Sequence, residues 1–239
     1  MEVALKLVDA HCHFDFPRFE GRRVSELEAA SQAGVVGLVI PGVRRPDWER
    51  VCNTALAYSG LFYCLGIHPW FVAEHSTEDL DALEQLLSRQ PDCCIAVGEC
   101  GLDRLHGELT AQRPWFEAQI ELASKLDYPL VIHSVRAHDE VHATLRRRNW
   151  CFIGVGGVIT HPRARKTRET VARLPLESLV LETDAPDMAP LGVAAGDNSP
   201  VYLRQILECL AEIRGEQPEY LASALFSNTE ALYGAALWQ

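Results

Sequence analysis

The sequence lacks the features of secreted, membrane-spanning and thiolate-metal proteins. Residues 1–9 contain one basic side chain and no apolar run followed by small residues, so no signal peptide is predicted. No apolar stretch approaches the roughly 18 residues that a membrane helix needs. The eight cysteines have no repeating spacing and no C-x-x-C pair, which argues against a disulfide framework and a thiolate zinc site. We therefore expect a cytoplasmic protein with reduced, buried thiols and no membrane contact.

Positive charge is also scarce. The chain has 22 Lys and Arg against 33 Asp and Glu, a net charge of −11, which opposes strong, general binding to nucleic acid. Two basic runs are local exceptions, one at residues 146–148 and one at 163–168. Each fits either phosphate binding or a solvated helix face, and charge runs more often form the latter.

What the sequence does contain is a regular alternation of two patterns. Short apolar runs predict buried parallel strands at 5–10, 35–41, 61–67, 93–98, 129–132, 151–159 and 179–181. Helical periodicity or helix boundary signals predict helices at 24–33, from about 46 to before 60, after Ser76, and at 112–126, 138–147, 167–174, 201–214 and 218–233. Such alternation predicts parallel βαβ units and an α/β barrel in one domain over residues 1–239. The count is seven strands, whereas a closed barrel of this kind has eight.

Polar residues with metal-binding or acid–base side chains cluster where these strands end. They are Asp9, His11 and His13 after the first strand, His68 after the third, Glu99 and Asp103 after the fourth, His133 after the fifth and Asp184 after the last. Barrel enzymes draw their working residues from strand ends on one face. This distribution therefore predicts an active site.

The residue types in this set favour a divalent metal ion. His11 and His13 are two apart, so both imidazoles point the same way on an extended strand, although an isolated pair of this kind more often consists of ordinary surface or packed histidines. Glu99 emerges from an apolar strand, where an unpaired carboxylate is costly. A salt bridge to arginine explains one such acid but not several, and a buried structural role explains His133 only when it is taken singly. Together, imidazoles and carboxylates favour a cation.

The predicted chemistry follows from this set. A metal ion with an open position lowers the pKa of bound water and offsets charge that develops on the scissile group. Asp184 is the candidate to take the proton from that water. The expected activity is metal-dependent hydrolysis.

Five ordered motifs resemble a known family. The strings DAHCHFD at 9–15, GIHP at 66–69, VGECGLD at 97–103, PLVIHS at 129–134 and LETDAP at 181–186 are similar to the signatures of TatD-type metal-dependent deoxyribonucleases, and residues 153–190 are similar to their YjjV-like branch. The resemblance implies a TIM-barrel hydrolase that cleaves DNA phosphodiesters, often as an exonuclease, with one or two Mg, Mn or Zn ions. It further implies a first metal held by His11, His13, Glu99 and Asp184, and a second bridged by Glu99 and bound by His133. We expect Asp184 and Glu99 to be catalytic, and His68 and Arg163 to bind the substrate.

The chain departs from the family pattern in one place. Relatives carry one more strand and helix between the fifth-strand motif and residue 153, and that strand ends in a further metal-binding histidine. The chain has no counterpart of this histidine, so we expect weaker binding of the second metal and either a gap or a re-closed barrel. His138, His142 and His161 are candidate substitutes. The alternatives to a deoxyribonuclease are a hydrolase of small esters or amides and a catalytically weak protein that binds metal or a partner.

Overall fold

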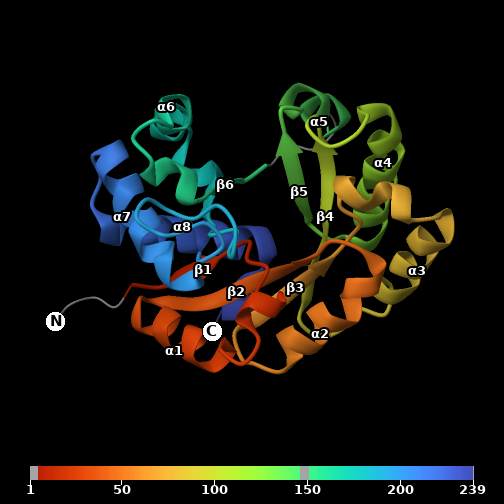
Figure 1. The fold of residues 1–239 in the computed structure, drawn as a ribbon, viewed down its shortest axis with the longest axis horizontal. Helices are drawn as coiled ribbons and strands as arrows, with labels where there is room; N and C mark the ends of the chain where they lie inside the picture. Colours follow the sequence, from red (N-terminus) through yellow and green to blue (C-terminus); the bar gives the residue numbers. More distant parts are fainter. Residues whose placement is uncertain (1–4, 146–150, 239) are drawn as a thin grey trace. The chain divides into compact units, whose positions relative to one another are not determined.

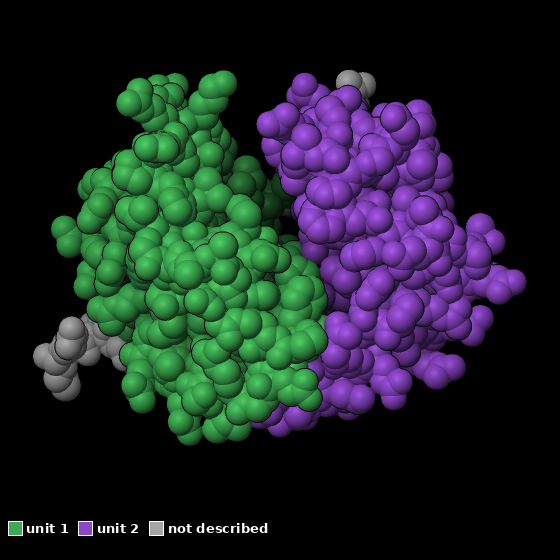
Figure 2. All heavy atoms as spheres, viewed as in Figure 1, with its two compact units in different colours: residues 1–39, 150–239 green, residues 40–149 purple. Residues whose placement is uncertain are grey.

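The computed structural model describes residues 5–145 and 151–238 (Figure 1). The chain forms two compact units, residues 1–39 with 150–239 and residues 40–149 (Figure 2). We describe each unit by itself, and the expectation of a single domain stays a prediction. Among the described residues, no helix is both long enough and apolar enough to cross a membrane.

The first unit is built from parallel strands covered by C-terminal helices. Its elements are β1 (Leu7–Asp9), α1 (Arg23–Gln32), β6 (Ile153–Val155), α6 (Arg165–Arg173), β7 (Leu179–Leu181), α7 (Leu203–Arg214) and α8 (Pro218–Tyr233), with short 3-10 turns at Pro17–Phe19, Gly157–Thr160, Leu176–Ser178, Pro200–Tyr202 and Ala235–Trp238. β6 pairs with β7 in parallel, and the Ala10 N–H donates to the Leu181 carbonyl beyond the end of β1. The apolar side chains of β1, β7, α7 and α8 share one core cluster.

β2 (Val35–Gly42) carries the chain from the first unit into the second. The second unit then contains α2 (Trp48–Leu56), β3 (Leu61–Leu65), α3 (Thr77–Leu87), β4 (Cys94–Asp103), α4 (Leu109–Leu126), β5 (Leu130–Val135) and α5 (His138–Leu145), with 3-10 turns at Arg45–Asp47 and Pro69–Glu74. The strand order is β1-β2-β3-β4-β5, and β3, β4 and β5 pair in parallel. Every residue of β4 is buried.

Local sequence signals account for several boundaries. The Ser76 and Asp79 side chains form a capping box at the start of α3, which satisfies N–H groups of the first turn. α8 begins at Pro218 and ends before Gly234, the favoured order of these two residues around a helix. The alternation of elements and the parallel pairing confirm the predicted α/β, TIM-barrel-like fold class.

All seven predicted strands are present, but only β7 has the predicted bounds. β4 extends to Asp103 and β5 to Val135, so Glu99, Asp103 and His133 lie within strands rather than after them. β6 is only three residues long, because a 3-10 turn begins at Gly157. α5 is described up to Leu145. The last two residues of its predicted range and the basic run 146–148 lie outside the described residues.

Candidate metal centre

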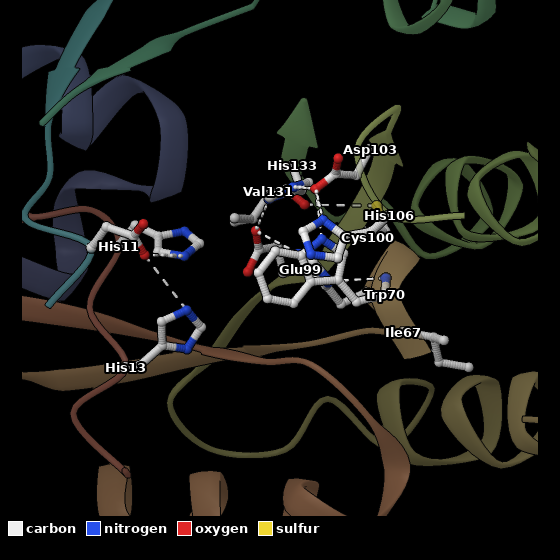
Figure 3. Close-up of polar contacts among 12 residues, drawn as sticks. His11, His13, Ile67, Trp70, Glu99, Cys100, Asp103, His106, Val131 and His133 are labelled. Carbon is white, nitrogen blue, oxygen red and sulfur yellow. Dashed lines mark hydrogen bonds and ion pairs between the residues drawn. The ribbon is translucent and has the colours of Figure 1, made fainter. Parts of the chain in front are cut away.

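Two groups of histidine and carboxylate side chains come together within the described residues. In each group, ligand atoms from three residues all lie within 4.8 Å of one another. The N-terminal group, in the first unit, contains His11, His13 and Asp184; the central group, in the second unit, contains His68, Glu99 and His133. Figure 3 labels four of these six residues: His11, His13, Glu99 and His133.

The N-terminal group is held by the ends of β1 and β7. Nε2 of His11 and Nε2 of His13 lie 3.5 and 3.6 Å from Oδ1 of Asp184. The Asp184 N–H donates to the His11 carbonyl at 2.9 Å, which ties the two segments together. The Asp184 side chain remains 33% exposed, whereas both imidazoles are largely covered.

Asp9 is not a member of this group but supports it through hydrogen bonds. Its carboxylate is fully buried and accepts hydrogen bonds from the Thr183 N–H at 2.9 Å and the Thr183 hydroxyl at 2.5 Å. Burial raises the pKa of Asp9 to about 7, although the hydrogen bonds from Thr183 and the His11 N–H act in the opposite direction. Asn198 donates to the Thr183 carbonyl at 2.8 Å. Asp9 therefore fixes the strand end from which Asp184 projects.

The central group depends on a close approach of β4 and β5. A side chain at Gly98 would place its Cβ 2.5 Å from the Val131 carbonyl oxygen, and one at Gly101 would lie 2.0 Å from the His133 carbonyl oxygen. Both glycines also have positive φ angles, 144° and 139°, which other residues rarely adopt. The two glycines allow the strands to meet with Glu99 against His133.

Within the central group, Glu99 lies between two imidazoles. Oε1 of Glu99 is 3.4 Å from Nε2 of His68 and 3.0 Å from Nδ1 of His133, and the two imidazole rings are 4.3 Å apart. Glu99 and His68 are buried, and the His133 side chain is 18% exposed. A buried carboxylate flanked by two imidazoles is a donor set that suits a divalent cation.

Asp103 fixes the orientation of His133. Its Oδ2 lies 3.0 Å from Nε2 of His133 and accepts a hydrogen bond from Nε1 of Trp70 at 2.6 Å. Burial acts to raise the pKa of Asp103, but hydrogen bonds from Trp70, His133 and the Leu105 N–H lower it to about 2. Burial lowers the pKa of His133, and the bonds and charges of Glu99 and Asp103 outweigh this effect and raise it. Because Nε2 faces Asp103, Nδ1 is the nitrogen that His133 offers to the group.

The spacing of the ligand atoms fits coordination better than hydrogen bonding. Atoms about 2.1 Å from a tetrahedral ion lie roughly 3.4 Å from one another. Three of the four imidazole–carboxylate distances in the two groups are 3.4, 3.5 and 3.6 Å, longer than the usual hydrogen bond of about 2.9 Å. The fourth, between His133 and Glu99, is 3.0 Å and has the length of a hydrogen bond. The residues present therefore fit divalent metal ions in both groups.

Two glutamines of α4 hold the backbone on which the central group stands. Oε1 of Gln119 accepts from the Ile67 N–H at 2.8 Å, and its Nε2 donates to the Ile67 carbonyl at 3.0 Å. Gln112 makes the same pair of bonds with Asp103, at 2.8 and 2.9 Å. Both side chains are buried, and their spacing of seven places them on one face of α4. One helix thus positions the segments that carry His68 and Asp103.

The other predicted residues take different positions. Arg163 is exposed between the turn at Gly157–Thr160 and α6. Arg168, from the same basic run, donates to the Ile159 carbonyl at 2.5 Å and so has a structural contact. His138 and His161 lie near the Ser134 hydroxyl and the Ala189 carbonyl. Neither they nor His142 belongs to either group found among the described residues.

Comparison with known proteins agrees with this geometry. The family model of the TatD related DNase matches residues 8–151 and 148–234. The chain belongs to the TatD DNase family. It is 38% identical to the uncharacterized metal-dependent hydrolase YjjV of Escherichia coli K12, over 95% of this chain and 98% of the relative. The crystal structure of E. coli YjjV matches with a TM-score of 0.90 and covers 96% of this chain and 98% of that one.

A nuclease of the family is also similar to the chain. The 3′-5′ ssDNA/RNA exonuclease TatD of Klebsiella pneumoniae is 32% identical over 86% of this chain and 89% of the relative. These relationships make the chain a metal-dependent hydrolase of the TatD family. The two segments matched by the family model meet at residues 148–151, and the alignment with YjjV spans 253 positions, more than the 239 residues of this chain. The alignment therefore contains gaps in this chain, and a shortened segment near residue 150 stays a prediction.

Proposed function

We propose that this TatD-family hydrolase is a deoxyribonuclease that removes nucleotides from the 3′ ends of single-stranded DNA. The observation that carries the proposal is the pair of histidine–carboxylate groups, whose donor atoms have the separations of metal ligands. Their chemistry suits hydrolysis of a phosphodiester, and a relative 32% identical to the chain is named a 3′-5′ ssDNA/RNA exonuclease. Support for DNA as the substrate comes from this relative and from the family model.

We propose one or two divalent ions (Mg, Mn or Zn) as the cofactor. The proposed ligands are His11, His13, Glu99, His133 and Asp184. When bound, such an ion lowers the pKa of a water ligand and offsets negative charge on the phosphate that is cleaved. Mixed imidazole and carboxylate ligands suit each of the three metals to some degree.

The protein's own groups then orient the reactants and transfer the proton. Asp184 is the partly exposed carboxylate of the N-terminal group, with 33% of its side chain exposed, and we assign it as the proton acceptor. Glu99 offsets the charge of the buried imidazoles beside it. His68 and Arg163 are the proposed substrate-binding residues, the latter because its exposed guanidinium can donate two parallel hydrogen bonds to one phosphate.

The net charge of the protein bears on its substrate, and its cysteines bear on its location. A net charge of −11 disfavours a long duplex, but a single-stranded end requires contact with only a few phosphates. All eight cysteines are free, which suits a reducing compartment. We therefore propose a cytoplasmic nuclease that acts on strand ends.

The decisive experiment compares native protein with Asp184→Asn on a single-stranded oligonucleotide labelled at its 5′ end. Magnesium, manganese and zinc are added separately after removal of metal by chelation. Asp187→Asn is the matched control, because Asp187 is an exposed aspartate three residues away in the same loop. We expect metal-dependent shortening from the 3′ end that Asp184→Asn abolishes and Asp187→Asn retains. Equal activity of native protein and Asp184→Asn would refute the proposed role.

One observation favours a second candidate function. The family match is divided at residues 148–151, the region in which we expect a strand, a helix and a metal-binding histidine to be missing. A protein that binds metal without cleaving DNA would show stoichiometric metal by elemental analysis and no oligonucleotide cleavage with any of the three ions. A hydrolase of small esters or amides would cleave such a substrate instead of the oligonucleotide.

A further inference from the structure

A large aromatic side chain stands exposed beside the central group. Trp70 is 48% exposed and follows His68 by two residues. Its ring centroid lies 5.2 Å from that of His68 and 6.1 Å from that of His133. Tryptophan is highly buried on average, and an indole that is exposed next to the candidate metal ligands is positioned to contact a bound substrate.

The indole is held in place by two contacts. Nε1 of Trp70 donates to Oδ2 of Asp103 at 2.6 Å. The ring of His106 lies against it with a centroid distance of 4.0 Å and an angle of 31°, and Nδ1 of His106 is 3.2 Å from the same carboxylate oxygen. Figure 3 labels both rings together with Asp103 and His133. The Trp70–His106 pair is therefore a fixed aromatic platform, with half of the His106 side chain also exposed.

We propose that the Trp70–His106 platform stacks on a nucleobase of the strand whose phosphate is cleaved. This inference rests on the proposed nuclease function. One sugar separates a base from its phosphate, a span comparable to the distances between the Trp70 ring and the rings of the central group. Stacking on an aromatic side chain is sequence-tolerant because every base has a π-face.

Because the protein is acidic, an uncharged contact such as this platform would strengthen the binding of a strand. Proteins that bind single strands commonly combine a basic groove with aromatic stacking. With 33 acidic and 22 basic side chains, this chain has little general attraction for phosphates, so contacts that do not depend on charge are needed in addition to those of Arg163 and the metal. An exposed, fixed aromatic pair at the proposed cleavage site supplies such a contact.

A structural role for Trp70 makes a different prediction. Through its bond to Asp103, the indole N–H could serve only to hold that carboxylate against His133. Trp70→Phe removes this N–H and keeps an aromatic face, whereas Trp70→Ala removes both. Leu105→Ala is the matched control for loss of an exposed apolar side chain, because Leu105 is 57% exposed and adjacent to His106.

The test measures binding separately from cleavage. Anisotropy titrations use two labelled oligonucleotides of equal length, one with normal 3′-terminal nucleotides and one with abasic sites there. The protein carries Asp184→Asn so that it does not degrade them. We expect binding to the normal strand to be tighter by about 10-fold, within the roughly 5- to 150-fold range of one stacked base. Trp70→Ala should abolish this preference, while Trp70→Phe and Leu105→Ala retain most of it.

Three results would overturn the inference: equal affinity for both strands, an unchanged preference in Trp70→Ala, or an equal loss in Trp70→Phe and Trp70→Ala. Leu105→Ala shows whether the loss of any exposed apolar side chain beside His106 lowers the preference for the normal strand. If the protein with Asp184 intact cleaves neither strand but the preference for the normal strand disappears with Trp70→Ala, the proposed hydrolysis fails and the base-stacking site stands.

Discussion

Replacing Gln119 by methionine tests how the central group is supported. The methionine side chain fills a similar volume but cannot bond to the Ile67 N–H or carbonyl, which Gln119 contacts at 2.8 and 3.0 Å. Ile67 is 1% exposed, so water cannot readily replace the lost partner. Each buried backbone group left without a partner costs about 1–3 kcal/mol. We therefore expect the free energy of unfolding to fall by about 2–5 kcal/mol.

The measurement is urea unfolding, monitored by circular dichroism and by tryptophan fluorescence. Gln85→Met is the matched control because Gln85 is exposed on α3, and a surface change of this kind alters stability by about 0.5 kcal/mol or less. Metal titration provides the second readout. His68 follows Ile67, so Gln119→Met should weaken metal binding and Gln85→Met should not. A loss in Gln119→Met no larger than that in the control would refute the support role of α4.

Three further predictions concern β4 and β5. Asp103→Asn should lower metal affinity by about 10- to 100-fold, because the Asp103 carboxylate orients His133, a proposed metal ligand. A native affinity in calorimetric titration would contradict this prediction. Gly98→Ala should prevent native folding or destabilise it by more than about 3 kcal/mol, since its Cβ would meet the Val131 carbonyl oxygen at 2.5 Å, and a native-like thermal midpoint would argue against the close strand approach. The pKa of His133 is raised in the folded protein, so its protonated form stabilises the metal-free protein below pH 6.5. This contribution is lost as the pH rises through the folded-state pKa. Metal binding needs the neutral ring, so the metal affinity should instead increase with pH in titrations between pH 6 and 8.5.

The architecture was predictable because its signals are local. Proline at position 218 and glycine at 234 define α8, and a serine followed three residues later by an aspartate marks the start of α3. The apolar runs located every strand. The ends of β4 and β5 were wrong because Glu99 and His133 are polar, and periodicity alone cannot show that glycines at 98 and 101 let the pairing continue past them.

The site was predictable only in part. The motifs identified His11, His13, Glu99, His133 and Asp184, but the direction of a side chain at a strand end is a three-dimensional property. His68 was predicted to bind substrate and lies among the potential metal ligands of the central group; its role in binding substrate stays a prediction.

Other supporting residues had no sequence signal. The bond between Trp70 and Asp103 joins segments 33 residues apart. Gln112 and Gln119 are polar side chains that helical periodicity would place on the solvent face, yet both are buried. Such residues are found only when the backbone groups that they satisfy are known.

The glutamine contacts of α4 have a consequence for how members of this family can change in length. The contacts described for the central group all come from residues 43–136, and those described for the N-terminal group come from residues before 40 and after 180. The junction at which the two family matches meet, residues 148–151, lies outside both sets. A change of chain length at this junction would therefore leave in place the contacts described here for each group.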